Sequence, residues 1–119
     1  MVNIIGQRLR SVTAMDKREA IKAAQNWVDS ISTKYKLSQA FVFGSYAKGN
    51  YGAHSDIDVA VVIKNVDNLF DVQVDLLQLR KDKNLLIEPH TFREDDFDTD
   101  DPFVNEIAQS GVKLHIACK

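Results

Sequence analysis

The chain has 119 residues, of which 45% are hydrophobic and 27% charged, a composition typical of one soluble globular domain. Its formal net charge of −2 argues against a broad nucleic-acid platform, which needs a strongly basic surface. A single cysteine, Cys118, excludes an internal disulfide and a cysteine-based zinc cluster. The sequence shows neither a signal-peptide pattern nor an apolar run that could cross a membrane, which predicts a cytoplasmic protein without membrane association.

The first predicted element is an amphipathic helix of about five turns that begins at Asp16. Asp16 and Glu19 have the spacing of a capping box, in which each side chain accepts from the other residue's backbone amide. Apolar residues then recur at helical spacing, at Ala20, Ala24, Trp27, Val28, Ile31 and Tyr35. We expect this stripe to pack on the core. The fifteen residues before Asp16 are ambiguous between a short helix and an irregular arm.

Two β-prone runs flank a polar segment in the middle of the chain. Residues 40–43 predict a short strand that ends at Gly44, and a loop or short helix is expected from Ser45 to His54. Ile57–Ile63 is an almost continuous run of apolar, mostly β-branched residues. A strand that is apolar on both faces indicates a central position in a sheet covered on both sides.

After this strand, helical and strand patterns alternate. Apolar spacing over 69–79 predicts a second long helix. Residues 85–88 are expected to form a third strand that stops at Pro89, because proline cannot donate to a sheet ladder.

The C-terminal part predicts one more helix and one more strand. Asp101 and Pro102 have the pattern of an N-cap followed by proline at the first helical position, and Gly111 suits a left-handed C-terminal cap. We therefore expect a helix over 102–110 and a short strand over 112–116. The fold class is α/β (α+β), a single mixed sheet with helices packed on it.

Asp56 and Asp58 lead directly into the most apolar strand. In a strand, residues i and i+2 point to one face about 6.7 Å apart, so both carboxylates are expected to aim the same way. Two like charges beside an apolar strand favour a divalent cation between them, and oxygen ligands favour Mg²⁺ or Mn²⁺. The ordinary alternative is a loop cap and a solvated strand end, since a two-residue motif often matches by chance.

The Gly44-Ser45 pair upstream favours the metal site over the ordinary alternative. Glycine lets a ligand approach the backbone closely, and Ser45 offers a hydroxyl where a helix would begin. Lys48 could add positive charge near a phosphate, although a solvated surface lysine is the simpler interpretation. Taken with Asp56 and Asp58, these residues predict one site for a triphosphate and its metal ions.

Gly44-Ser45, ten intervening residues and Asp56-x-Asp58 resemble the signature of the DNA polymerase β-like nucleotidyltransferase superfamily. Four further residues match its usual G-S-x-A-x-G…S-D-I-D form, namely Ala47, Gly49, Ser55 and Ile57. The resemblance is closest to the small stand-alone minimal nucleotidyltransferases of the MNT antitoxin type. It implies one nucleotidyltransferase domain over 1–119, with a core of about 16–116. The sequence departs from the pattern at Lys48, where many members carry arginine.

The resemblance also implies a third carboxylate on a later strand. Asp75 falls within a predicted helix and Asp82 in a charged turn, whereas Glu88 closes the predicted strand 85–88. Members of the family more often have aspartate there, and the ordinary alternative for Glu88 is a solvated strand end before Pro89. The expected ligands of two Mg²⁺ ions are therefore Asp56, Asp58 and Glu88, and Mn²⁺ is an alternative ion.

The expected reaction is attack of an acceptor hydroxyl on the α-phosphate of an NTP, ATP above all, with loss of pyrophosphate. Gly44, Ser45 and Lys48 would hold the β and γ phosphates. The resemblance implies that a second protein supplies the acceptor, because minimal nucleotidyltransferases commonly adenylylate a tyrosine of a HEPN-domain toxin. The alternative is a catalytically silent module of the same fold that neutralises or scaffolds a partner. A homo-oligomer is compatible with both.

Other polar clusters are less informative. Asp96-x-Asp98-x-Asp100 resembles the start of an EF-hand loop, but it lacks the glycine and the final glutamate of that loop, so an exposed loop is expected. His54 and His90 lie near predicted site residues, and a loop histidine is more often merely exposed.

Overall fold

The computed structural model describes residues 16–52, 55–80 and 85–117. Their centre is a four-stranded sheet in the order β3-β2-β1-β4. Strand β1 (Leu37–Phe43) is antiparallel to β2 (Ile57–Ile63) and to β4 (Val112–Lys113), whereas β2 is parallel to β3 (Ile87–Arg93). The mixed sheet confirms the predicted α+β class.

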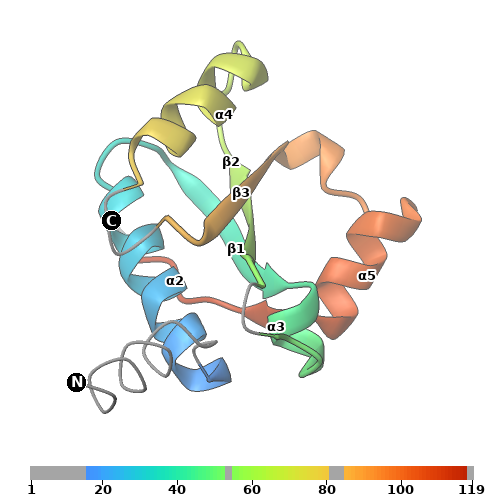
Figure 1. The fold of residues 1–119 in the computed structure, drawn as a ribbon. Helices are drawn as coiled ribbons and strands as arrows, with labels where there is room; N and C mark the ends of the chain where they lie inside the picture. Colours follow the sequence, from blue (N-terminus) through green and yellow to red (C-terminus); the bar gives the residue numbers. More distant parts are fainter. Residues whose placement is uncertain (1–15, 53–54, 81–84, 118–119) are drawn as a thin grey trace, which may run out of the picture.

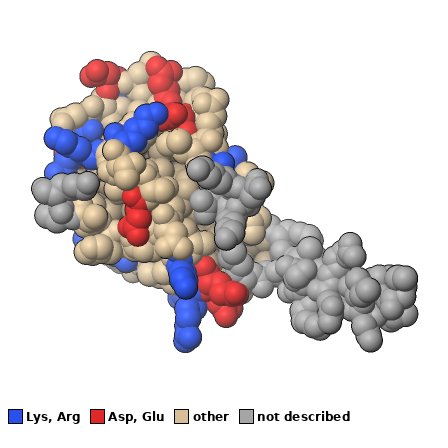
Figure 2. All heavy atoms as spheres, turned by 90° about the vertical axis from the view of Figure 1, so that its left-hand side faces the viewer, with Lys and Arg blue, Asp and Glu red and all other residues tan. Residues whose placement is uncertain are grey.

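Helices cover both faces of this sheet (Figure 1). Helices α2 (Lys17–Ile31) and α4 (Leu69–Gln78) lie on one face, and α5 (Pro102–Ser110) lies on the other. The one-turn helix α3 (Ser45–Lys48) joins β1 to β2, and the 3₁₀ turn η2 (Glu94–Asp96) follows β3. None of the helices in the described ranges has the length and apolar content of a membrane span. The face of α2 and α4 carries both acidic and basic side chains (Figure 2).

Helix α2 begins as its sequence predicts and ends one turn early. Asp16 accepts from the Glu19 amide at 2.8 Å, and Glu19 accepts from the Asp16 amide at 3.1 Å, which confirms the capping box. At the other end the Ser32 hydroxyl donates to the Val28 carbonyl at 2.8 Å. Such side-chain bonds compete with helix propagation. The predicted five turns up to Tyr35 were therefore too long.

The side chains of β2 alternate between two apolar layers, one on each face of the sheet. Val59 and Val61 face α2 and α4 in a core that includes the fully buried Trp27. Ala60 faces the other way, into a smaller layer with Phe41, Phe43 and Ile107. A strand buried on both faces confirms the predicted central position of Ile57–Ile63. Because Asp58 has the same parity as Ala60, its side chain lies on the α5 side of the sheet.

The prediction that β3 stops at Pro89 was wrong, since the strand runs from Ile87 to Arg93. The Leu86 carbonyl accepts from the Ile57 amide at 2.8 Å. In a parallel pair, the backbone N–H and C=O groups of every second residue point to the neighbouring strand. The backbone groups of Glu88 and His90 therefore point to β2, and those of Pro89 point away from the sheet. Strand β3 is the edge of the sheet, where a missing amide breaks no ladder.

Side chains of α4 and its C-terminal end occupy this outer edge. Arg80 donates through Nη1 to the Ile87 carbonyl at 3.0 Å. Gln73 donates through Nε2 to the Pro89 carbonyl at 2.8 Å and accepts from the Thr91 hydroxyl at 3.0 Å. The outward carbonyls of Ile87 and Pro89 are therefore satisfied within the chain.

The C-terminal elements agree with the prediction only in part. Helix α5 has the predicted bounds, and Asp101 accepts from the Phe103 amide at 2.8 Å. Gly111, expected in a left-handed conformation, is extended at φ −76° and ψ 163°. A Cβ there would overlap the Ile107 carbonyl oxygen, so close packing requires the glycine. Strand β4 has only Val112–Lys113 of the five residues predicted.

Candidate active site

The ends of β1 and β2 bring Gly44 next to Asp58. Phe43 pairs with Asp58 in the antiparallel register, and Gly44 follows with φ +75° and ψ −147°. A Cβ on Gly44 would overlap Oδ2 of Asp58 and lie 3.3 Å from its Cγ. Glycine was expected here so that a ligand could approach the backbone. The structure shows that the group closest to it is the Asp58 carboxylate.

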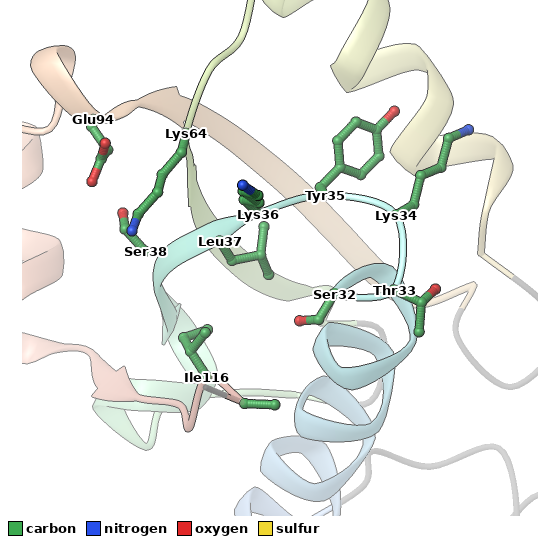
Figure 3. A pocket seen from close by; sticks show the side chains of 11 residues that line it. Ser32, Thr33, Lys34, Tyr35, Lys36, Leu37, Ser38, Lys64, Glu94 and Ile116 are labelled. Atoms are coloured by element: carbon green, nitrogen blue, oxygen red, sulfur yellow. The ribbon is translucent and has the colours of Figure 1, made fainter. Parts of the chain in front are cut away.

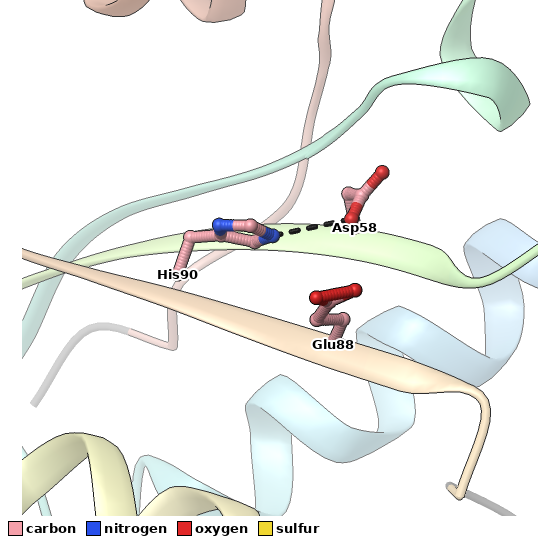
Figure 4. Close-up of side chains that lie close together, drawn as sticks. All are labelled: Asp58, Glu88 and His90. Carbon is pink, nitrogen blue, oxygen red and sulfur yellow. Dashed lines mark hydrogen bonds and ion pairs between the residues drawn. The ribbon is translucent and has the colours of Figure 1, made fainter.

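Glu88 lies beside Asp58 across the parallel pair of β2 and β3. The register places the two residues directly opposite each other, so their side chains share the α5 face of the sheet. Ligand atoms of Asp58, Glu88 and His90 all lie within 4.8 Å of one another (Figure 4). We refer to these three residues as the acidic cluster. Glu88 is exposed, and the Asp58 side chain keeps 27% of its surface accessible.

His90 is the member of the acidic cluster that the sequence did not assign. Its Nε2 lies 3.1 Å from Oδ1 of Asp58, and its ring packs edge-on against Phe43 with centroids 4.9 Å apart. Thus one oxygen of Asp58 bonds to His90 and the other rests against Gly44. The available signal was the two-residue spacing of Glu88 and His90, hidden by the assumption that Pro89 ends the strand.

Asp56 occupies a different position from Asp58. It lies one residue before β2 and is exposed, and the acidic cluster does not include it. Just before it, the Ser55 hydroxyl accepts from the Gly52 amide at 2.8 Å. The metal-binding role of Asp56 stays a prediction. His54 lies outside the described residues.

Lys48 lies at the end of α3 and contacts α5. Its Nζ is 2.5 Å from Oε2 of Glu106, so the predicted phosphate contact would have to exchange with this ion pair. Ser45 begins α3, and its carbonyl accepts from the Gly49 amide at 2.9 Å. The short helix thus fixes Ser45 immediately after Gly44 and ties the Gly44–Lys48 segment to α5.

Comparison with known proteins agrees with this geometry. The family model described as "Polymerase beta, Nucleotidyltransferase" matches residues 25–116. The chain belongs to this nucleotidyltransferase family. Its fold also resembles the crystal structure of a "putative nucleotidyltransferase" from Sulfolobus solfataricus, with a TM-score of 0.60, 22% identity and coverage of 82% of this chain and 80% of that one.

Two curated relatives of this nucleotidyltransferase come from Methanocaldococcus jannaschii. One is named "Putative protein adenylyltransferase MJ0141" and is 30% identical over 103 residues, covering 81% of this chain and 99% of the relative. The other, "Putative protein adenylyltransferase MJ0604", is 39% identical over 57 residues, covering 46% of this chain and 54% of the relative. This protein is therefore an enzyme of the nucleotidyltransferase class.

The chemistry of the acidic cluster fits a divalent cation. Asp58 and Glu88 supply the hard oxygen donors that such ions prefer, and His90 bonds to Asp58 beside them. Among the ion pairs of the described residues, neither carboxylate pairs with lysine or arginine. Adjacent carboxylates without a basic partner repel each other, which a cation relieves. A site for a metal ion is thus available to this nucleotidyltransferase.

A separate hollow of about 760 Å³ lies at the other end of the β1–β2 pair (Figure 3). Lys36 and Lys64 line it together with hydroxyl side chains of Ser32 and Ser38. It contains none of the predicted site residues, so its size does not make it the catalytic site. The predicted carboxylates Asp58 and Glu88 lie in the acidic cluster instead.

Tyr35 at the rim of this hollow forms a network with α4. Its hydroxyl bonds to Asp75, whose Oδ2 also lies 2.7 Å from Nζ of Lys34. Hydrogen bonds from Lys34 and then from Tyr35 lower the pKa of Asp75. Burial, reinforced by the bond to Asp75 and its negative charge, raises the pKa of Tyr35 to about 12.

Proposed function

We propose that this nucleotidyltransferase transfers AMP from ATP to a hydroxyl group of another protein. The observation that carries the proposal is the pairing of Asp58 with Glu88 beside Gly44, in a chain of this family. The names of the two relatives described above, both "Putative protein adenylyltransferase", support the nucleotide and the class of acceptor.

Asp58 and Glu88, joined by Asp56, would hold Mg²⁺, with Mn²⁺ as a substitute. The bound ions would offset the charge of the triphosphate and lower the pKa of the acceptor hydroxyl. Gly44 and Ser45 would lie along the β and γ phosphates. His90 bonds to one oxygen of Asp58 and Gly44 leaves room for the other, so this carboxylate is oriented before substrate binds.

In the proposed step the acceptor oxygen attacks the α-phosphorus of ATP. A new bond forms between this oxygen and phosphorus, and the bond to the oxygen bridging the α and β phosphates breaks. Pyrophosphate leaves with the bonding electrons, and the hydroxyl proton passes to solvent. Because the bonds change on the substrates alone, the enzyme contributes mainly position and charge.

For the acceptor we propose a tyrosine of a partner HEPN-domain toxin, which adenylylation would inactivate. The acidic cluster lies at an accessible end of the strands, with Glu88 exposed and 31% of the His90 side chain accessible. This exposure supports an acceptor delivered by a second protein. A protein tyrosine could reach such a site without entering a deep pocket.

The test is to incubate the enzyme and its cognate HEPN protein with Mg²⁺ and ATP, then measure intact masses. We expect the partner to gain the mass of AMP on a tyrosine, and Asp58→Asn to prevent the gain. A stable complex that forms without any adduct, with either Mg²⁺ or Mn²⁺, would show a silent binding module instead. An adduct on a serine or threonine would retain the activity and correct the acceptor.

A further inference from the structure

Phe103 is an aromatic side chain that the fold leaves half exposed close to the acidic cluster. It lies in the first turn of α5 with 49% of its surface accessible, whereas Val104 and Ile107 on the same helix are buried. Its ring contacts Phe43 edge-on at 5.7 Å and Phe92 at 6.3 Å between centroids. One side of the ring is thus fixed by packing while much of its surface remains open.

Phe43 connects this ring to the acidic cluster. The Phe43 ring lies 4.9 Å from the His90 ring, and His90 bonds to Asp58. Phe103 and the imidazole of His90 therefore both contact the Phe43 ring, which links them in one chain of aromatic contacts. A nucleotide places its base one ribose away from its α-phosphate. If the phosphates lie at Asp58 and Glu88, the base can reach the exposed part of Phe103.

An exposed ion pair links α5 to the Gly44–Lys48 segment. Glu106 follows Phe103 by three residues, so both side chains emerge on neighbouring parts of the helix surface. Its carboxylate binds Lys48 at the end of α3. Helices α3 and α5 also both pack on β1, so the predicted phosphate-binding residues and the open aromatic ring lie on elements with a common support.

We propose that the Phe103 ring stacks on the purine base of the bound ATP. The inference rests on the proposed function, because it assumes that the acidic cluster receives the triphosphate. Every base has an apolar face that an aromatic ring can cover, and such stacking adds affinity without demanding a hydrogen-bond pattern. Phe70 is more exposed, at 74%, but its helix α4 lies on the opposite side of the sheet from α5 (Figure 1). Exposure alone does not single out Phe103, whereas its connection to His90 does.

The test compares binding of two magnesium complexes by titration calorimetry, that of α,β-methylene-ATP and that of inorganic tripolyphosphate. Phe103→Leu keeps an apolar side chain against Phe43 but removes the aromatic face. We expect it to weaken binding of the ATP analogue roughly tenfold and to leave tripolyphosphate binding unchanged. Phe103→Tyr should bind the analogue within about twofold of wild type. Phe70→Leu is the matched control and should bind both ligands as wild type does.

Two results would overturn the stacking role while the proposed function stands. In the first, Phe103→Leu binds the ATP analogue as tightly as wild type. In the second, it loses affinity for the analogue and for tripolyphosphate equally, which would mean that Phe103 only supports the fold. If wild type bound neither ligand, the proposed function and the stacking role would fail together.

Discussion

The carboxylate of Asp58 rests against the α-carbon of Gly44, where the Cβ of any other residue would overlap Oδ2. This contact joins the two halves of the family signature. Gly44 ends the strand that precedes the Ser45 helix, and Asp58 belongs to the neighbouring antiparallel strand. The conformation of one residue therefore sets the position of the other.

Gly44→Ala should lower both stability and activity. Alanine would be strained at φ +75° and would also displace Asp58, so we expect a loss of about 1–3 kcal/mol in the free energy of unfolding. Nucleotidyl transfer should fall far more than this loss explains. Urea denaturation and initial rates measure the two effects.

Gly49→Ala is the matched control for this substitution. Gly49 also has a left-handed φ, +85°, but an added Cβ there would meet open space. It should show a similar backbone strain, roughly 1–2 kcal/mol, with transfer activity retained. Equal transfer rates for Gly44→Ala and Gly49→Ala would contradict the role given to the Asp58 contact.

Asp58→Asn and Glu88→Gln should each weaken metal binding. Each removes a charge from the acidic cluster while nearly preserving side-chain volume. Loss of a residue that only hydrogen-bonds to a metal ligand typically costs 10–100-fold in metal affinity. Loss of a ligand itself should therefore cost at least about 100-fold. Paramagnetic resonance titration with Mn²⁺ measures this without turnover. Glu94→Gln, a neutralised acid on η2, is the control, and an equal loss there would point to nonspecific charge.

His90→Phe should separate two roles of His90, the hydrogen bond that orients Asp58 and the packing of its ring on Phe43. Phenylalanine can keep the edge contact with Phe43 but cannot hydrogen-bond to Asp58. We expect a loss of about 10–100-fold in metal affinity or in kcat, with little change in stability. His90→Gln, which can still donate a hydrogen bond to Asp58, should recover part of the loss. Identical behaviour of the two variants would argue against the hydrogen bond.

The Asp75 network should contribute stability that depends on pH. Hydrogen bonds from Lys34 and Tyr35 lower the folded pKa of Asp75 below the unfolded value of about 3.9. Its contribution is therefore present above that pH and is lost as the pH falls through the folded pKa. The difference in unfolding free energy between wild type and Asp75→Asn should shrink below about pH 4.

Urea denaturation from pH 6 down to the acid transition checks this prediction. Asp67→Asn, at an exposed position just before α4, serves as the comparison. Its stability relative to wild type should vary less with pH. A constant offset for Asp75→Asn across the whole range would show that the effect is packing rather than charge.

Local signals account for the parts of the fold that the sequence predicted well. Asp16 and Glu19 satisfy each other's amides, and Asp101 satisfies the Phe103 amide just after Pro102, so the starts of α2 and α5 could be placed to the residue. The apolar run Ile57–Ile63 indicated a central strand because burial on both faces leaves no polar alternation. The closeness of Gly44 to Asp58 has a local origin too, since both residues lie at recognisable ends of strands.

The remaining features depend on contacts that short segments do not encode. Whether Pro89 ends a strand depends on which side of that strand is open, and this is decided by the sheet order. His90 could be assigned only once the strand was known to continue beyond Pro89. Lys48 meets Glu106 from a distant part of the chain, and a predicted phosphate ligand thus has a protein partner.

The outer side of β3 has a consequence for how this enzyme meets other proteins. Pro89 offers no amide there, and Arg80 and Gln73 already occupy the carbonyls of Ile87 and Pro89. An incoming chain cannot extend the sheet along this stretch by backbone pairing. Along this stretch, recognition of the proposed protein acceptor would rely on side-chain surfaces, which can change between partners without altering the strands that carry Asp58 and Glu88.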